Sequence, residues 1–169
     1  MKLNRPIPLM IVLAFLLSFN SFCAEECSSW ERLIANEGCL MSATDIDFTT
    51  SGSIFEKKDW QSFFQAARKD EKIFIFIIRK FSSRRPTQIH ICNFRNATEG
   101  ELAVFVAQQI VKKNWHVYNG DNCEIKRIVK KKVAAKVLLL PDILSDKSLC
   151  IALQRYFIEH HKLKFRHKR

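Results

Sequence analysis

Two histidines and a lysine are the residues in this chain whose types suit acid–base chemistry. His90 and His116 lie in segments of strand-like composition, and the turn-forming pair Asn119–Gly120 would place Lys126 across a hairpin from His116. Two imidazoles flanking a phosphate, with a lysine nearby, can cleave a phosphodiester without a metal. The pattern therefore permits a small ribonuclease-like hydrolase, although such histidines are more often ordinary, partly buried side chains.

Glu124 and Lys126 also have the E-x-K spacing that places an acid and a lysine on one side of a strand. A metal-dependent nuclease uses such a pair to handle metal-bound water and a phosphate, but it needs a second acid from a neighbouring strand. Asp121 is the nearby acid, and it lies in the turn. The cysteines lack C-x-x-C spacing, and four scattered glycines cannot form a phosphate loop. We expect no metal and no cofactor, and an enzyme is the less favoured class.

The whole chain has a formal net charge of +11, and its basic side chains gather in the second part. Acidic residues outnumber basic ones ten to five over 25–71, whereas basic residues outnumber acidic ones 21 to seven over 72–169. Basic clusters bind phosphate or sulfate groups with an affinity that falls as salt rises. The predicted anion-binding residues are Arg79, Lys80, Arg84, Arg85, Lys126, Arg127, Lys130, Lys131 and Lys132. Suitable partners are nucleic acid, an anionic membrane or acidic envelope polymer, and an acidic protein. Aromatic residues that could stack on bases are missing from these clusters apart from Phe81 and Phe165.

The N-terminus has the layout of a secretory signal peptide, with two basic residues before an apolar stretch over 7–19. This stretch is shorter than the roughly 18 residues that a membrane-spanning helix requires. We therefore expect cleavage after Cys23, no transmembrane segment in the mature chain, and a secreted or periplasmic location. Export favours disulfide formation, and Cys27 and Cys39, on either side of a short helix, are the predicted pair.

A run of β-branched and aromatic residues, Ile73–Ile78, predicts the central strand of a sheet. Because the run has no polar member, both of its faces must be covered. A helix that begins at Asp59 has an apolar stripe at i, i+3, i+4 and i+7 and is expected to pack on this strand. A second strand over 87–94 would follow through a hairpin with a basic tip.

The elements further along the chain alternate between helix and strand. Thr98 and Glu101 have the spacing of a capping box, which opens an apolar helix through Asn114. Strands over 115–118, 123–132 and 133–140 follow, and Asp142 or Ser145 is expected to cap a last helix. The expected fold is a single α+β domain, or a mixed α/β one, with a sheet of about four or five strands. The predicted boundaries are a signal peptide over 1–23, a helical and irregular segment over 24–58, the α+β domain over 59–161 and a basic tail over 162–169.

The segment from Phe63 to Ile78, followed by Phe81-Ser82-Ser83-Arg84-Arg85-Pro86, resembles the helix, strand and active-site turn of thioredoxin-like proteins. In that register Ser82 and Arg85 stand where the family has its two redox cysteines. Neither residue can form a disulfide, so the resemblance implies a thioredoxin-like fold without thiol exchange at this turn.

The charge pattern and the absence of a catalytic motif together favour a binding protein. The first prediction is a secreted or periplasmic, non-enzymatic interaction protein with a strongly basic surface that binds an anionic macromolecule or surface. The alternatives are the phosphodiester hydrolase, with His90, His116 and Lys126 as its candidate residues, and the thioredoxin-like fold without redox cysteines.

Overall fold

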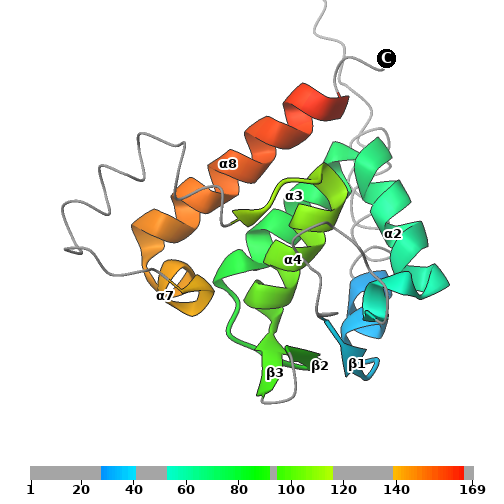
Figure 1. Ribbon diagram of the computed structural model, residues 1–169. Coiled ribbons are helices and arrows are strands. Elements are labelled where there is room, and N and C mark those ends of the chain that lie inside the picture. The colour runs from blue at the N-terminus through cyan, green and yellow to red at the C-terminus, as the bar shows by residue number, and fades with distance from the viewer. Residues whose placement is uncertain (1–27, 41–52, 92–94, 116–138, 166–169) are drawn as a thin grey trace, which may run out of the picture. The chain divides into compact units, whose positions relative to one another are not determined.

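A computed structural model describes residues 28–40, 53–91, 95–115 and 139–165 of the chain. The chain divides into two compact units, 1–33 and 34–169. In the first unit the described residues form the start of a helix over 28–34, in which Trp30 and Leu33 are buried. The second unit contains all the helices and strands labelled in Figure 1.

Three short strands form a mixed sheet in the order β1-β2-β3. β1 (Gly38–Cys39) pairs in parallel with β2 (Pro86–Ile91), and β2 pairs antiparallel with β3 (Arg95–Thr98). In β2, Thr87 and Ile89 are buried while Pro86, Gln88 and His90 are exposed, as expected of a half-covered strand. The prediction of an α+β fold is confirmed, whereas the described residues supply three strands of the expected four or five.

The run predicted as the central strand is a helix, α3 (Glu71–Arg79). Asp70 begins it, because its Oδ1 accepts a hydrogen bond from the Lys72 amide at 2.8 Å. Ile73, Phe74, Ile77 and Ile78 are buried, and the two residues between these pairs are half-exposed, which is a helical rather than a strand pattern. The prediction of a central strand at Ile73–Ile78 is therefore wrong. Strand propensity amounts to about 1 kcal/mol and gives way to packing that needs a helical face.

The helix at Ile73–Ile78 also contradicts the thioredoxin-like resemblance. It implied a strand over the run at Ile73–Ile78, where the structure has the helix α3. After the turn, β2 occupies Pro86–Ile91, within the segment where the sequence predicted a strand over 87–94. The hairpin predicted between 73–78 and 87–94 is absent for the same reason.

The central element of the second unit is α4 (Glu99–Val111), all of whose residues are buried. Figure 1 shows α4 among the other helices, and it contacts α2, α3, α7, α8 and the 3₁₀ helix η3 (Lys80–Ser82). The predicted capping box is present, since the Glu101 amide donates to Thr98 Oγ1 and the Thr98 amide donates to Glu101 Oε2. The helix ends at Lys112, which has a φ of 56°.

The remaining helices cover α4 with apolar stripes. α2 (Lys58–Lys69) buries Trp60, Phe63, Phe64 and Ala67, as predicted, and follows the short 3₁₀ helix η2 (Ile54–Glu56). The last helix is divided into α7 (Leu140–Ser145) and α8 (Lys147–Phe165), and α8 buries an apolar stripe that includes Leu149, Ala152, Leu153, Tyr156 and Phe157.

The helix starts differ from those expected. Lys57 precedes α2, so Asp59 lies inside the first turn and is not the cap. Asp146 caps α8 in place of Asp142 or Ser145, because its Oδ1 accepts hydrogen bonds from the amides of the two residues after Lys147, at 2.8 and 3.2 Å. α8 also continues through Phe165, so the predicted basic tail begins inside a helix.

Several predicted elements fall on residues outside the described ranges. These are the signal peptide over 1–23, the strands over 123–132 and most of 115–118 and 133–140, and the end of the tail. None of the helices in the described ranges has both the length and the apolar character needed to cross a membrane.

Candidate functional site

The basic segment 79–85 links α3 to β2 and passes beside the first turn of α4. Lys80 Nζ and Arg85 Nη2 lie 3.2 and 3.0 Å from Glu99 Oε1. The Glu99 side chain is only 4% exposed, and its other oxygen accepts a hydrogen bond from Ser83 Oγ at 2.5 Å. Two of the four predicted cations in this segment therefore neutralise a buried carboxylate and fix the course of the segment.

Backbone contacts hold the same segment against α4. The Glu99 amide donates to the Arg85 carbonyl at 2.7 Å, and the Gly100 amide donates to the Ser83 carbonyl at 3.0 Å. The next amide donates to the Thr98 side chain. Because the chain itself satisfies these first amides of α4, they are not available to bind an external anion.

A second ion pair lies beside the first, between Arg95 of β3 and Glu101 of α4. The Arg95 guanidinium donates two hydrogen bonds to the Glu101 carboxylate, at 2.8 and 2.6 Å. Burial alone would raise the pKa of Glu101, but the hydrogen bonds and charge of Arg95, together with the bonds from Thr98, hold it below its ordinary value. Glu101 is therefore a carboxylate at neutral pH, and Arg95 balances its charge.

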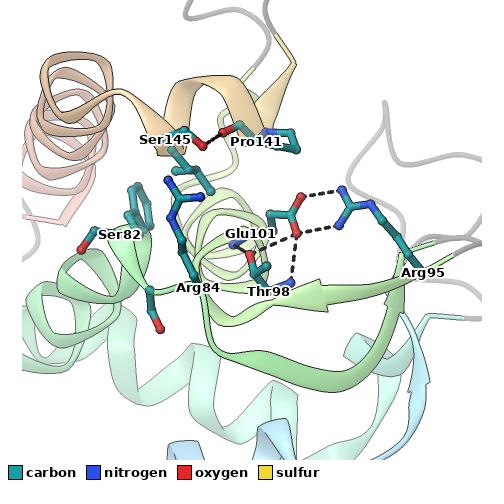
Figure 2. Close-up of a pocket in the computed structure, with 10 residues that line it drawn as sticks. Ser82, Arg84, Arg95, Thr98, Glu101, Pro141 and Ser145 are labelled. Carbon is teal, nitrogen blue, oxygen red and sulfur yellow. Dashed lines mark hydrogen bonds and ion pairs between the residues drawn. The ribbon is translucent and has the colours of Figure 1, made fainter.

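A cavity of about 280 Å³ opens next to these two ion pairs. Figure 2 shows Arg84 extending from the 79–85 segment toward Ser145 of α7, with the Arg95–Glu101 pair on another wall. The described residues form no ion pair with Arg84, which is exposed. The residues lining the cavity are Phe81, Ser82, Ser83, Arg84, Arg95, Thr98, Glu101, Pro141, Leu144 and Ser145.

A second hollow, of about 380 Å³, lies on the α8 side of Arg84. It shares Ser82, Arg84, Leu144 and Ser145 with the first cavity and adds Lys147, Cys150, Ile151 and Gln154. Arg84 therefore borders both hollows. We call the two hollows and their shared wall the Arg84 groove.

No family model, curated protein or solved structure matches this chain. The function must therefore be argued from the chemistry of the Arg84 groove and the other charged sites.

The structure places some of the predicted site residues and not others. Arg79 is exposed at the end of α3, and Arg84 borders the groove, whereas Lys80 and Arg85 are paired with Glu99. His90 is exposed on β2. The remaining candidates lie outside the described residues: His116, Lys126, Arg127, Lys130, Lys131, Lys132 and, of the predicted disulfide pair, Cys27. The described part of the chain contains no group of three potential metal ligands.

Another set of cations, which the sequence did not reveal as a group, lies at the C-terminal end of α4. The Arg68 side chain donates to the carbonyls of Gln109 and Ile110 at 3.1 and 3.4 Å, and Lys164 Nζ donates to the Val111 carbonyl at 2.9 Å. Such donors satisfy the last carbonyls of a helix and complement its dipole. Arg68 and Lys164 are therefore basic residues that stabilise the fold.

His161 of α8 is buried next to these cations. Its Nε2 lies 3.1 Å from the Ala67 carbonyl, and its ring stacks on Phe74 with centroids 4.1 Å apart. Burial lowers the pKa of His161, and the carbonyl bond and the charge of Glu71 oppose this shift only in part. His161 is therefore a neutral packing residue at physiological pH.

Proposed function

We propose that this chain is a secreted or periplasmic, non-enzymatic interaction protein that binds an anionic partner at the Arg84 groove. The observation that supports the proposal is the state of Arg84. Glu99 and Glu101 are balanced by Lys80, Arg85 and Arg95, while the described residues offer Arg84 no acid. Among the described residues its charge is thus left available to an anionic partner.

The binding is expected to depend on charge rather than on base stacking. Phe81, the aromatic residue within the basic segment, is completely buried, and Phe165 lies against His161 at a ring distance of 4.8 Å. Stacking platforms for bases require exposed aromatic faces. The expected partner therefore presents phosphate, sulfate or carboxylate groups, and its bases, if it has any, do not stack on Phe81.

The first experiment measures binding of the mature chain to a fluorescent heparin fragment as a function of salt. Arg84→Glu is compared with Lys69→Glu, a matched charge reversal at an exposed position of α2. Arg84→Glu is expected to weaken binding by about tenfold or more and to reduce the slope of log K against log salt by about one. Lys69→Glu is expected to change affinity less than about threefold. Equal losses in the two variants would show that binding depends on net charge alone and would overturn the assignment to the groove.

The expected location is tested separately. The full chain is expressed in a host with a secretory pathway, and the N-terminus of the exported product is sequenced. We expect a mature chain that begins at Ala24. Retention of the whole protein inside the cell would contradict this part of the proposal.

A further inference from the structure

We infer that the Arg84 groove is a site for a single tetrahedral oxyanion, a phosphate or sulfate group, and this inference rests on the function proposed above. The group is either part of a small molecule or a substituent on a polymer. The inference follows from the charge balance, the available donors and the size of the groove.

The charge balance around the groove fits a dianion. Beside the first cavity, four basic side chains accompany two acidic ones: Lys80, Arg84, Arg85 and Arg95 against Glu99 and Glu101. The surplus there is two positive charges, and Lys147 on the second hollow is a further cation. A phosphate monoester has a charge of about −1.5 to −2 at pH 7, whereas a simple carboxylate or a sulfate ester has −1. A dianionic phosphate group would therefore neutralise the surplus at the first cavity.

The donors that remain available fit a tetrahedral group better than a flat one. Three of the four hydroxyls along the cavity already donate within the chain: Ser83 to Glu99, Thr98 to Glu101, and Ser145 to the Pro141 carbonyl. Ser82, in contrast, is exposed and the described residues give its hydroxyl no hydrogen bond. The Arg84 guanidinium can form two parallel bonds to one oxyanion, and Ser82 adds a donor from the chain two residues earlier. A phosphate or sulfate has a third terminal oxygen for that donor, which a carboxylate lacks.

The dimensions of the groove fit a phosphorylated organic group. The first cavity, at about 280 Å³, is near the lower end of the roughly 300–1,000 Å³ range of small-molecule sites. Pro141 and Leu144 give it an apolar wall. The second hollow adds Ile151, which is 38% exposed on α8. With the oxyanion at Arg84, the organic part of the ligand would lie against these apolar residues.

The test is a calorimetric titration of the mature chain with inorganic phosphate, phenyl phosphate, sulfate and acetate at constant ionic strength. We expect phosphate, phenyl phosphate and sulfate to bind, phenyl phosphate most tightly, and acetate to bind at least about tenfold more weakly. Phosphate affinity should fall between pH 8 and pH 5.5 as the dianion takes up a proton, while sulfate affinity should not. Acetate binding as tightly as phosphate would overturn the inference.

Variants assign the binding to the groove. Arg84→Gln is expected to reduce phosphate affinity about tenfold or more, and Ser82→Ala by about threefold to tenfold. Both positions are exposed, so both variants should fold, which circular dichroism checks. Lys69→Gln on α2 is the matched control and should bind phosphate as the wild type does. Equal losses in Arg84→Gln and Lys69→Gln would refute a site in the groove.

The two proposals fail in distinguishable ways. Arg84-dependent binding to heparin without binding to phosphate or sulfate would overturn the oxyanion site and leave the function in place. Binding to phenyl phosphate without binding to heparin, RNA or anionic vesicles would support the site, identify a small molecule as its source and remove the macromolecular partner. Absence of both would overturn both.

Discussion

Replacing Gly100 with alanine tests the close approach that positions Arg84. A Cβ at Gly100 would collide with the Phe81 carbonyl oxygen and lie 2.7 Å from the Ser83 carbonyl oxygen. Ordinary contact begins at 3.4 Å, so the Ser83 oxygen must move by about 0.7 Å, and overpacking of this kind costs about 1–3 kcal/mol. The better helix propensity of alanine offsets about 0.5–1 kcal/mol. We expect a net loss of about 1–2 kcal/mol and a fall in Tm of about 3–8 °C.

The matched control is Gly38→Ala in β1. There the three atoms nearest to the new Cβ, at 2.8, 3.0 and 3.1 Å, all belong to the side chain of Ile54 and not to the backbone. We expect a smaller loss, below about 1 kcal/mol. Urea unfolding gives both free energies, and phosphate titration shows whether Gly100→Ala also weakens the groove. If Gly100→Ala is as stable as the wild type, or loses no more than Gly38→Ala, the 81–83 segment does not lie against α4 as described.

Three further predictions concern buried titratable groups. Glu101→Gln should lower the free energy of unfolding at pH 7 by about 1–2 kcal/mol through loss of the charged bond to Arg95. Because the pKa of Glu101 is lowered in the folded chain, urea titrations should show this difference shrinking as the pH falls below 4.5 and disappearing only below the lowered pKa. Burial lowers the pKa of His161 from 6.5, so the unfolded chain binds a proton more readily than the folded one, and the free energy of unfolding should fall below pH 6.5. The fall should be smaller in His161→Gln. A pH profile of this variant that runs parallel to that of the wild type would contradict the prediction. Burial raises the pKa of the Cys150 thiol, so alkylation at pH 8 should be about tenfold or more slower in the native chain than in urea, as measured by peptide mapping. Equal rates would show that the thiol is accessible in the native chain.

The helices with one apolar stripe could be predicted from the sequence. In α2 the stripe from Trp60 to Ala67 stands out against polar neighbours, and at α4 the Thr98–Glu101 spacing indicates the first turn. α3 could not be recognised by the same means because its half-exposed positions, Ile75 and Phe76, are apolar as well. The available signal was Asp70 followed by Glu71, which is typical of a helix start.

The candidate site was predicted only in part. Its basic residues are adjacent in the sequence, so the cluster at 79–85 could be found without a structure. The acid that pairs with two of these residues is distant in sequence, since Glu99 lies 14 residues from Arg85. Because Glu99 forms ion pairs with both Arg85 and Lys80, these two cations are less available to bind a partner. A charge count along the chain cannot distinguish these two from Arg84, because the difference depends on tertiary contacts.

The burial of α4 has a consequence for the order of events during synthesis. Its covering helices come from both sides of the sequence, α2 and α3 before it and α7 and α8 after it. At roughly 5–20 residues per second, α4 leaves the ribosome about 3–10 s before α8 is complete, and nonspecific collapse takes well under a second. The apolar residues of α4 that α7 and α8 cover therefore stay exposed for far longer than a chain needs to aggregate or to be bound by a chaperone. A nascent chain arrested ahead of Lys147 is expected to remain chaperone-bound, and completion of α8 is the step that releases it.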